Sequence, residues 1–178
     1  MRKKKIIIVV SCIILMFAAV GSLMIPRWLR MQPDRALDWF AREIEAGRVG
    51  DMRLRVYYLD PFFHTRTIQP ISINELINGF DSIKTVVDVE GSSLEDYIEL
   101  LRLMNRHLLV SSNSRGKVDV RIYYVFETNE GRRIFDMGMW VSGTYGNVLI
   151  NGQEFEWNDI FLDIVMPFLP DADSLFSR

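Results

Sequence analysis

Residues 118–141, VDVRIYYVFETNEGRRIFDMGMWV, decide the fold of this chain. Apolar side chains occupy every even position from 118 to 126 and every odd position from 135 to 141. Successive side chains of a β-strand point to opposite faces, so each run predicts a strand with one apolar face. The Asn-Glu-Gly sequence between the two runs is typical of a turn, which predicts an antiparallel hairpin.

Two turn lengths are compatible with this hairpin. A four-residue loop over residues 128–131 pairs Tyr124 with Phe135 and places the apolar positions of both strands on one face. A three-residue loop over residues 129–131 has good turn chemistry, but it pairs Tyr124 with Asp136. Because a shift of one residue turns a whole strand over, the hydrophobic pattern favours the four-residue loop.

The opposite face of the hairpin carries charged side chains together with two large aromatic rings. Its members are Asp119, Arg121, Tyr123, Ile134, Asp136 and Trp140. Aromatic rings beside charged groups are typical of contact surfaces for a protein or a glycan. The candidate binding residues of this face are therefore Tyr123, Trp140, Arg121 and Asp136. In the alternative interpretation a helix, for example residues 34–46, covers the face and buries the rings.

A second candidate contact region is the stretch over residues 60–71, which begins with Asp-Pro and shows no regular periodicity. It contains Phe62, Phe63 and His64, which are candidate binding residues because functional side chains concentrate on loops. The alternative interpretation of His64 is an ordinary turn residue, since no partner for it is evident in the sequence.

Periodicity and capping signals predict helices over residues 33–46, 72–80, 93–108 and 159–166. Alternation, β-branched side chains and turn signals predict strands over residues 52–59, 83–89, 118–126, 135–141, 147–150 and 153–157. The last four strands follow one another through short turns, and helices do not alternate with strands as in repeated crossover units. The sequence therefore predicts an α+β fold in which helices pack on one face of a mainly antiparallel β-sheet.

Two capping boxes support the helix assignments. Ser72-Ile73-Asn74-Glu75 predicts the start of a short helix. Ser92-Ser93-Leu94-Glu95 predicts the start of the helix with the clearest apolar stripe in the chain. Its apolar stripe consists of Leu94, Tyr97, Ile98, Leu101, Met104 and Leu108.

The first thirty residues are typical of a membrane segment. MRKKK is followed by residues 6–25, which contain no charge. At about 1.5 Å per residue, a helix of this length covers about 30 Å, the thickness of a hydrocarbon core. More bases precede the span than follow it, which favours an N-terminus inside and a body outside the cell membrane. A secretory signal cleaved near Gly21 is the alternative, and both interpretations export the body.

Charge is distributed unevenly along the chain. Residues 1–30, the basic start with the predicted membrane helix, hold six Lys or Arg and no acid. The predicted globular domain, residues 31–178, holds 15 bases against 23 acids and has a net charge of −8. Such a domain repels phosphate backbones, so we expect no nucleic-acid partner. The single cysteine, Cys12, excludes an intrachain disulfide and a cysteine-based metal cluster.

The sequence offers little for catalysis. It contains no Gly-x-Ser-x-Gly elbow, phosphate loop or dinucleotide fingerprint, and we expect neither a metal nor a cofactor. Glu154 and Glu156 lie two apart on one predicted strand, about 7 Å from each other, a separation that suits acid–base catalysis. Their alternation with Phe155 and Trp157 indicates instead that they form the exposed side of that strand.

These features predict a membrane-anchored, extracytoplasmic α+β domain of a bacterial cell. Binding to a protein or a glycan is the expected role, because an exported domain without a catalytic motif is typical of an interaction module. Two other functions stay open: a cell-envelope hydrolase that uses paired carboxylates, and an accessory subunit of a membrane complex.

Overall fold

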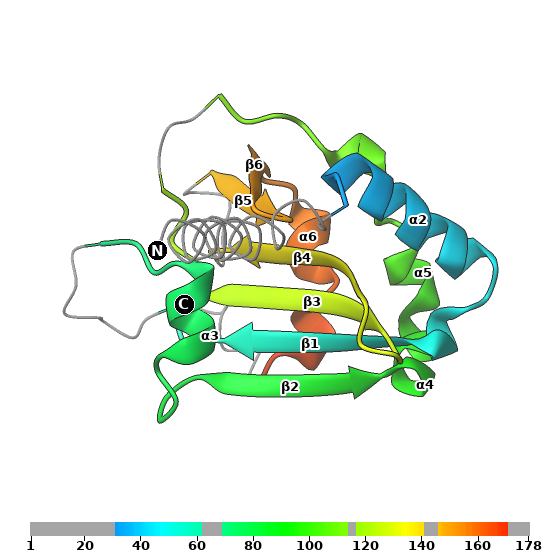
Figure 1. Ribbon diagram of the computed structural model, residues 1–178, viewed down its shortest axis with the longest axis horizontal. Helices are drawn as coiled ribbons and strands as arrows, with labels where there is room; N and C mark the ends of the chain where they lie inside the picture. Colours follow the sequence, from blue (N-terminus) through cyan, green and yellow to red (C-terminus); the bar gives the residue numbers. More distant parts are fainter. Residues whose placement is uncertain (1–30, 62–68, 114–116, 141–145, 171–178) are drawn as a thin grey trace, which may run out of the picture. The chain divides into compact units, whose positions relative to one another are not determined.

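The computed structural model describes residues 31–61, 69–113, 117–140 and 146–170. All of these except Met31 belong to one unit, Gln32–Arg178. Figure 1 shows that this unit contains a single β-sheet with short helices beside it.

The sheet has six strands in the order β2-β1-β3-β4-β5-β6, and every neighbouring pair is antiparallel. The strands are β1 (Met52–Tyr58), β2 (Thr85–Glu90), β3 (Ile122–Thr128), β4 (Arg133–Met139), β5 (Asn147–Ile150) and β6 (Gln153–Glu156). The fold is therefore α+β with an antiparallel sheet, as the sequence predicts.

The helical segments are short, apart from the first. The α-helices are α2 (Pro33–Glu45), α3 (Ile73–Asn78), α4 (Gly91–Leu94), α5 (Ile98–Leu101) and α6 (Asp159–Asp163). Turns of 3₁₀-helix are η1 (Val49–Asp51), η2 (Glu95–Tyr97), η3 (Arg106–Leu108) and η5 (Met166–Phe168).

Side-chain caps fix the starts of α3 and α6. The backbone N–H of Glu75 donates to the Ser72 hydroxyl, and the Glu75 carboxylate accepts from the Ser72 N–H, so the first predicted capping box is confirmed. The Asn158 side chain caps α6 by accepting from the N–H of Ile160. These caps satisfy backbone donors that the helices themselves leave unpaired.

The prediction of one continuous helix over residues 93–108 is wrong. The segment forms α4, η2, α5 and η3 in succession, and α4 begins at Gly91 without a Ser92 cap. A Cβ atom on Gly91 would lie 2.5 Å from the carbonyl oxygen of Gly50, so the start of α4 is pressed against η1. Leu94 of the predicted stripe is nevertheless fully buried. Tertiary packing therefore determines where this segment is α-helical and where it is not. The periodicity of the sequence indicates only which of its side chains are buried.

β3 and β4 form the predicted hairpin, but with a different register. Tyr124 pairs with Met137 rather than with Phe135, so the predicted four-residue loop is wrong. The N–H of Thr128 donates to the carbonyl of Arg132 at 2.9 Å, which closes the three-residue loop instead. The favourable turn chemistry of Asn-Glu-Gly therefore determines the loop.

A β-bulge reconciles this loop with the hydrophobic pattern. The register shifts by one residue between Phe126 and Glu127. The extra residue returns the apolar positions of both strands to one face, where Phe126 pairs with Phe135. The hairpin thus combines the favourable three-residue turn with apolar positions on one face. Without a bulge, the three-residue loop would lose the common apolar face, and the four-residue loop would lose the favourable turn.

One face of the sheet packs against α2 and α6. The ring centroid of Phe40 in α2 lies 4.8 Å from that of Phe126 and 5.1 Å from that of Phe135. The Tyr124 hydroxyl donates to the carbonyl of Phe161 in α6 at 3.0 Å. Burial raises the pKa of Tyr124 well above its usual value, which keeps this hydroxyl protonated as a donor.

The other face is covered at one end by α3. Leu76 of α3 packs with Tyr123 and Val125 of β3 in one apolar cluster. Figure 1 shows α3 in front of the sheet, near the ends of β1 and β3. The prediction that helices pack on one face only is therefore wrong. The polar face carries enough apolar side chains at this end to bury a short helix, and α2 packs on the opposite face.

In the described part of the chain, no helix has both the length and the apolar character needed to cross a bilayer. The predicted span over residues 6–25 lies outside the described residues. The membrane segment therefore stays a prediction from the sequence.

Candidate functional site

The candidate binding residues on the polar face of the hairpin are mostly buried. Tyr123 is 1% exposed, Arg121 5% and Asp136 0%. Leu76 and other apolar side chains around α3 cover the Tyr123 ring. Tyr123 is therefore part of the core and not of the protein surface, and Trp140 alone of the four keeps partial exposure.

Contacts within the fold engage the charges on this face. The Arg121 guanidinium lies 5.1 Å from the centroid of the Trp140 ring, and its Nε lies 3.5 Å from the Asp119 carboxylate. The Arg133 guanidinium donates to the buried Asp136 carboxylate at 3.1 Å. These arginines and carboxylates stabilise the hairpin and its surroundings.

The other residues singled out in the sequence lie elsewhere. Phe62, Phe63 and His64 are outside the described residues, so their role stays a prediction. The carboxylate of Glu154 accepts a hydrogen bond from the Asn147 side chain, and Glu156 is exposed. Neither glutamate lines either of the two hollows described next.

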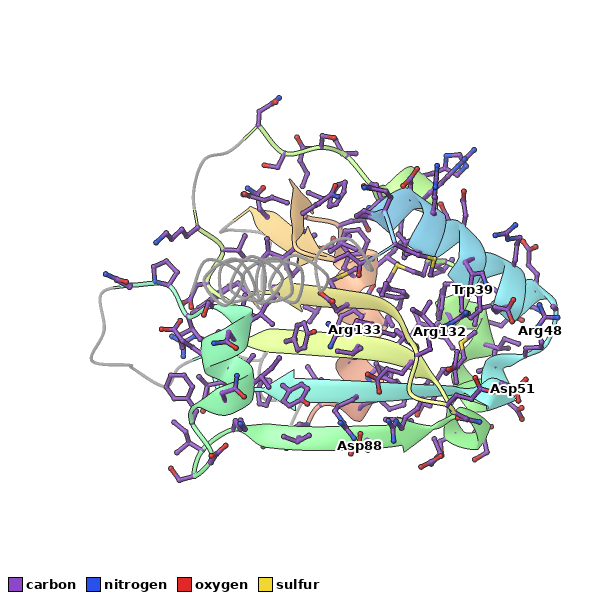
Figure 2. All side chains as sticks on the ribbon, viewed as in Figure 1. Trp39, Arg48, Asp51, Asp88, Arg132 and Arg133 are labelled. Carbon is purple, nitrogen blue, oxygen red and sulfur yellow. The ribbon has the colours of Figure 1, made fainter. Side chains whose placement is uncertain are left out.

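A hollow of about 430 Å³ opens where α2 approaches the turn between β3 and β4. We call it the turn hollow; it is lined by Trp39 and Glu43 of α2, Asp51 of η1, and Asn129 and Arg132 of the turn, among others. Figure 2 shows Trp39, Asp51 and Arg132 at the same end of the sheet. Two stretches that are far apart in the sequence, residues 39–52 and 128–132, thus build one site.

An arginine stacked on a tryptophan forms one wall of the turn hollow. The guanidinium carbon of Arg132 lies 5.4 Å from the centroid of the Trp39 ring. Arg132 is exposed, and it forms no ion pair with any carboxylate in the described ranges. The stacking orients the guanidinium, and because no ion pair with a described carboxylate takes up its N–H groups, they can donate to a ligand.

Hydrogen bonds fix the frame of the turn hollow. Arg48 donates to the Glu43 carboxylate through two N–H groups at 2.6 and 2.7 Å, and these bonds lower the pKa of Glu43. The backbone N–H of Asn129 donates to the carbonyl of Asp51 at 2.9 Å. Its side-chain amide donates to the carbonyl of Gly50 at 3.2 Å. A ligand therefore meets a preorganised surface, which lowers the entropic cost of binding.

Both signs of charge line the turn hollow. Arg48 and Arg132 supply hydrogen-bond donors, and the carboxylates of Asp51 and Glu130 supply acceptors. No group of three or more His, Cys, Asp or Glu that could hold a metal ion occurs among the residues that the structure describes. The arrangement can bind a polar ligand that carries donors and acceptors.

A second hollow of about 550 Å³ lies beside the start of α2. Three of its polar side chains, those of Gln32, Gln153 and Arg106, already have partners. The Gln153 amide donates to the Gln32 side chain at 2.9 Å, and Arg106 pairs with Asp38 at 3.3 Å. Because these groups already have partners, the turn hollow is the better candidate for a recognition site.

One feature of the sequence signals the turn hollow. The buried stripe of α2 contains Ala36, Leu37, Phe40 and Ile44, and Trp39 does not belong to it. Tryptophan is enriched at protein interfaces, so its place outside the buried stripe of α2 is a signal for a contact residue. Arg132 carries no such signal, because only the fold brings it to Trp39.

Comparisons of the chain with protein-family models, with characterised proteins and with solved structures find no match. The function is therefore inferred from the geometry and chemistry of the site itself.

Proposed function

We propose that this chain is a membrane-anchored, extracytoplasmic binding module whose turn hollow holds a polypeptide segment of a protein partner. The observation that carries the proposal is the Arg132 guanidinium, which is stacked on Trp39 and forms no ion pair with a described carboxylate. Tryptophan and arginine are enriched among the side chains that contribute most to binding energy at protein interfaces.

The chemistry of the hollow favours a polypeptide over a glycan. Arg132 occupies one face of the Trp39 ring, so that face is not open for stacking on a sugar. The hollow offers donors from its arginines and acceptors from Asp51 and Glu130. A polypeptide segment presents carbonyls, N–H groups and charged side chains of both signs, and it satisfies both kinds of group.

Membrane anchoring is the second part of the proposal. The uncharged stretch over residues 6–25 and the basic start before it support an anchored chain with its body outside. Cysteine labelling tests this in a Cys12→Ser background. We expect a membrane-impermeant maleimide to label Asn113→Cys in spheroplasts, and to label Lys3→Cys only after lysis. Labelling with the opposite preference would contradict the orientation.

Photo-crosslinking tests the recognition site. We expect a photoreactive amino acid at Glu130, an exposed residue of the turn hollow, to give a discrete adduct in living cells. Arg132→Ala in the same chain should reduce the adduct by about tenfold or more, because a hydrogen bond to a charged group contributes about 1.5–3 kcal/mol. The same photoreactive group at Lys117, which is exposed but does not line the hollow, is the matched control.

An adduct of equal yield with and without Arg132, at an unchanged unfolding midpoint, would contradict the site. An adduct obtained from position 117 and not from position 130 would place recognition elsewhere on the body.

A further inference from the structure

A carboxylate of the protein itself, Glu43, lines the same hollow as the stacked arginine. Glu43 follows Trp39 by four residues, so both side chains lie on one face of α2, about 5–6 Å apart at their Cβ atoms. Arg132 stacks on the Trp39 ring and lines the turn hollow together with Glu43. Although the structure describes both side chains, no ion pair joins Arg132 to Glu43.

Arg48 explains why this ion pair does not form. Its Nε donates to one oxygen of the Glu43 carboxylate at 2.6 Å, and its Nη2 donates to the other oxygen at 2.7 Å. Figure 2 shows Arg48 and Arg132 at the end of the sheet where α2 ends, and both line the turn hollow. Because both oxygens of Glu43 are held by short, charge-assisted hydrogen bonds, Glu43 stays with Arg48 and leaves Arg132 unpaired.

We propose that Arg48 is a positioning residue that keeps the Arg132 guanidinium free, and that this guanidinium binds an aspartate or glutamate side chain of the bound polypeptide segment. This role rests on the proposed function of the turn hollow and adds the chemistry of the group that binds there. Arginine N–H groups match the two oxygens of a carboxylate in both geometry and charge. The Trp39 ring already holds the guanidinium in place, so less conformational freedom is lost on binding.

Charge along the α2 side of the hollow favours an anion at Arg132. Hydrogen bonds from Arg48 lower the pKa of Glu43, and the charges of Arg42 and Arg132 lower it further. Three guanidinium groups thus act on one carboxylate, which leaves positive charge in excess on this side of the hollow.

Two further carboxylates of the hollow, those of Asp51 and Glu130, oppose a second acid and favour a basic segment instead. The charge of Asp51 is partly balanced by Arg48: hydrogen bonds to Glu43 raise the pKa of Arg48, and the charge of Asp51 raises it further. A basic segment would set like charges beside Arg48 and Arg132, and it would offer Arg132 main-chain carbonyls alone as acceptors. An acidic residue is therefore the better complement to Arg132.

Removal of Arg48 tests its positioning role in living cells, with the photoreactive amino acid at position 130 of the full-length chain as reporter. Arg48→Ala releases Glu43, which should then pair with Arg132 and lower the yield of the adduct several-fold. Adding Glu43→Gln to Arg48→Ala removes the competing carboxylate and should restore most of the yield. A loss of structure alone would not be restored in this way, because the double variant lacks the same ion pair.

Arg102→Ala is the matched control, because it also breaks an exposed pair of arginine and glutamate, with Glu99, and lies outside the lining of the turn hollow. It should leave the yield of the adduct unchanged. An equal yield in Arg48→Ala and wild type, or no recovery in the double variant at a wild-type unfolding midpoint, would overturn the positioning role and leave the proposed function intact. No adduct in the wild-type chain would contradict the proposed function itself.

A selection from a random octapeptide library, displayed without a free C-terminal carboxylate, identifies the group that Arg132 binds. On immobilised full-length protein in detergent micelles, we expect Asp and Glu to be enriched several-fold over Asn and Gln at one position. Arg132→Ala should abolish this enrichment, and Arg48→Ala should reduce it. Enrichment of Lys and Arg at that position, or no preference for the acids over their amides, would overturn the assignment of a carboxylate.

Discussion

Two arginine–tryptophan contacts of similar geometry lie in different environments in this molecule. Arg121 is 5.1 Å from the ring of Trp140, and Arg132 is 5.4 Å from the ring of Trp39. Arg121 is buried and has the Asp119 carboxylate beside it. Arg132 is exposed at the turn hollow and has no described carboxylate as an ion-pair partner.

The stacking of an arginine on a tryptophan therefore does not by itself identify a recognition site. In the first region α3 and its neighbours cover the adjacent Tyr123 ring, and the charges bind partners inside the fold. In the second region the same contact holds a guanidinium at the surface of a hydrogen-bonded frame. Solvent access and ion pairing separate a structural contact from a binding contact.

The largest expected loss of stability follows from a substitution at Tyr123, which lies beneath α3. Tyr123→Ala should lower the free energy of unfolding by about 3–5 kcal/mol, because it removes a fully buried aromatic ring and leaves a cavity. Tyr57→Ala on the neighbouring strand is the matched control, since Tyr57 packs at 5.8 Å from Tyr123 but is only partly buried. Urea unfolding measures both. A loss below about 1 kcal/mol for Tyr123→Ala would show that this face is open.

The two arginines provide the direct contrast. Arg121→Ala should lower the free energy of unfolding by about 1.5–3 kcal/mol, because a buried charged donor and its contacts are lost. Arg132→Ala should change it by no more than about 0.5 kcal/mol, as expected for an exposed side chain. Thermal or urea unfolding of the two variants, measured side by side, checks this. Equal losses would remove the distinction between the two regions.

A smaller loss of stability is expected when the cap of α3, the helix that packs over Tyr123, is removed. Ser72→Ala should cost about 1 kcal/mol, because it removes the hydroxyl that accepts from the N–H of Glu75. Ser72→Thr keeps a capping hydroxyl and should stay close to wild type. The same unfolding assay measures both. Similar losses in the two variants would mean that the cap does not hold α3 in place.

The smallest effect is a pH dependence of that cap. Hydrogen bonds from the backbone N–H and the hydroxyl of Ser72 lower the pKa of Glu75 below its ordinary value of 4.5. A lowered pKa in the folded state means that this contribution to stability is present above pH 4.5 and is lost as the pH falls below it. Glu75→Gln should therefore destabilise the protein more at pH 7 than at pH 3. The same difference in unfolding free energy at both pH values would contradict the role of the carboxylate.

Side-chain alternation and local turn chemistry predicted most of the sheet. The even positions of β3 and the odd positions of β4 share one buried face, as expected. The tight turn at Asn151-Gly152 has positive φ at both residues, as its sequence predicts. These features depend on residues close together in the chain, so the sequence specifies them directly.

Features that depend on distant segments were not predicted. The β-bulge at Phe126/Glu127 reconciles a turn preference with a packing preference, and neither alone indicates it. The sequence left open that a helix covers Tyr123, but it suggested residues 34–46; the cover is α3, which only the folded chain brings to β3. For the same reason the sequence signalled Trp39 but not Arg132, which only the folded chain brings to the Trp39 ring.

Hydroxyl-radical footprinting of the full-length protein tests the recognition site most directly. Purified in detergent, the protein should be oxidised readily at Trp39 and hardly at all at Tyr123. In native membranes Trp39 should become protected several-fold, whereas Trp157, which does not line the turn hollow, should be oxidised equally in both samples. Equal oxidation of Trp39 in the two samples would contradict a recognition site at the turn hollow, and oxidation of Tyr123 above that of Trp39 would contradict the burial of Tyr123.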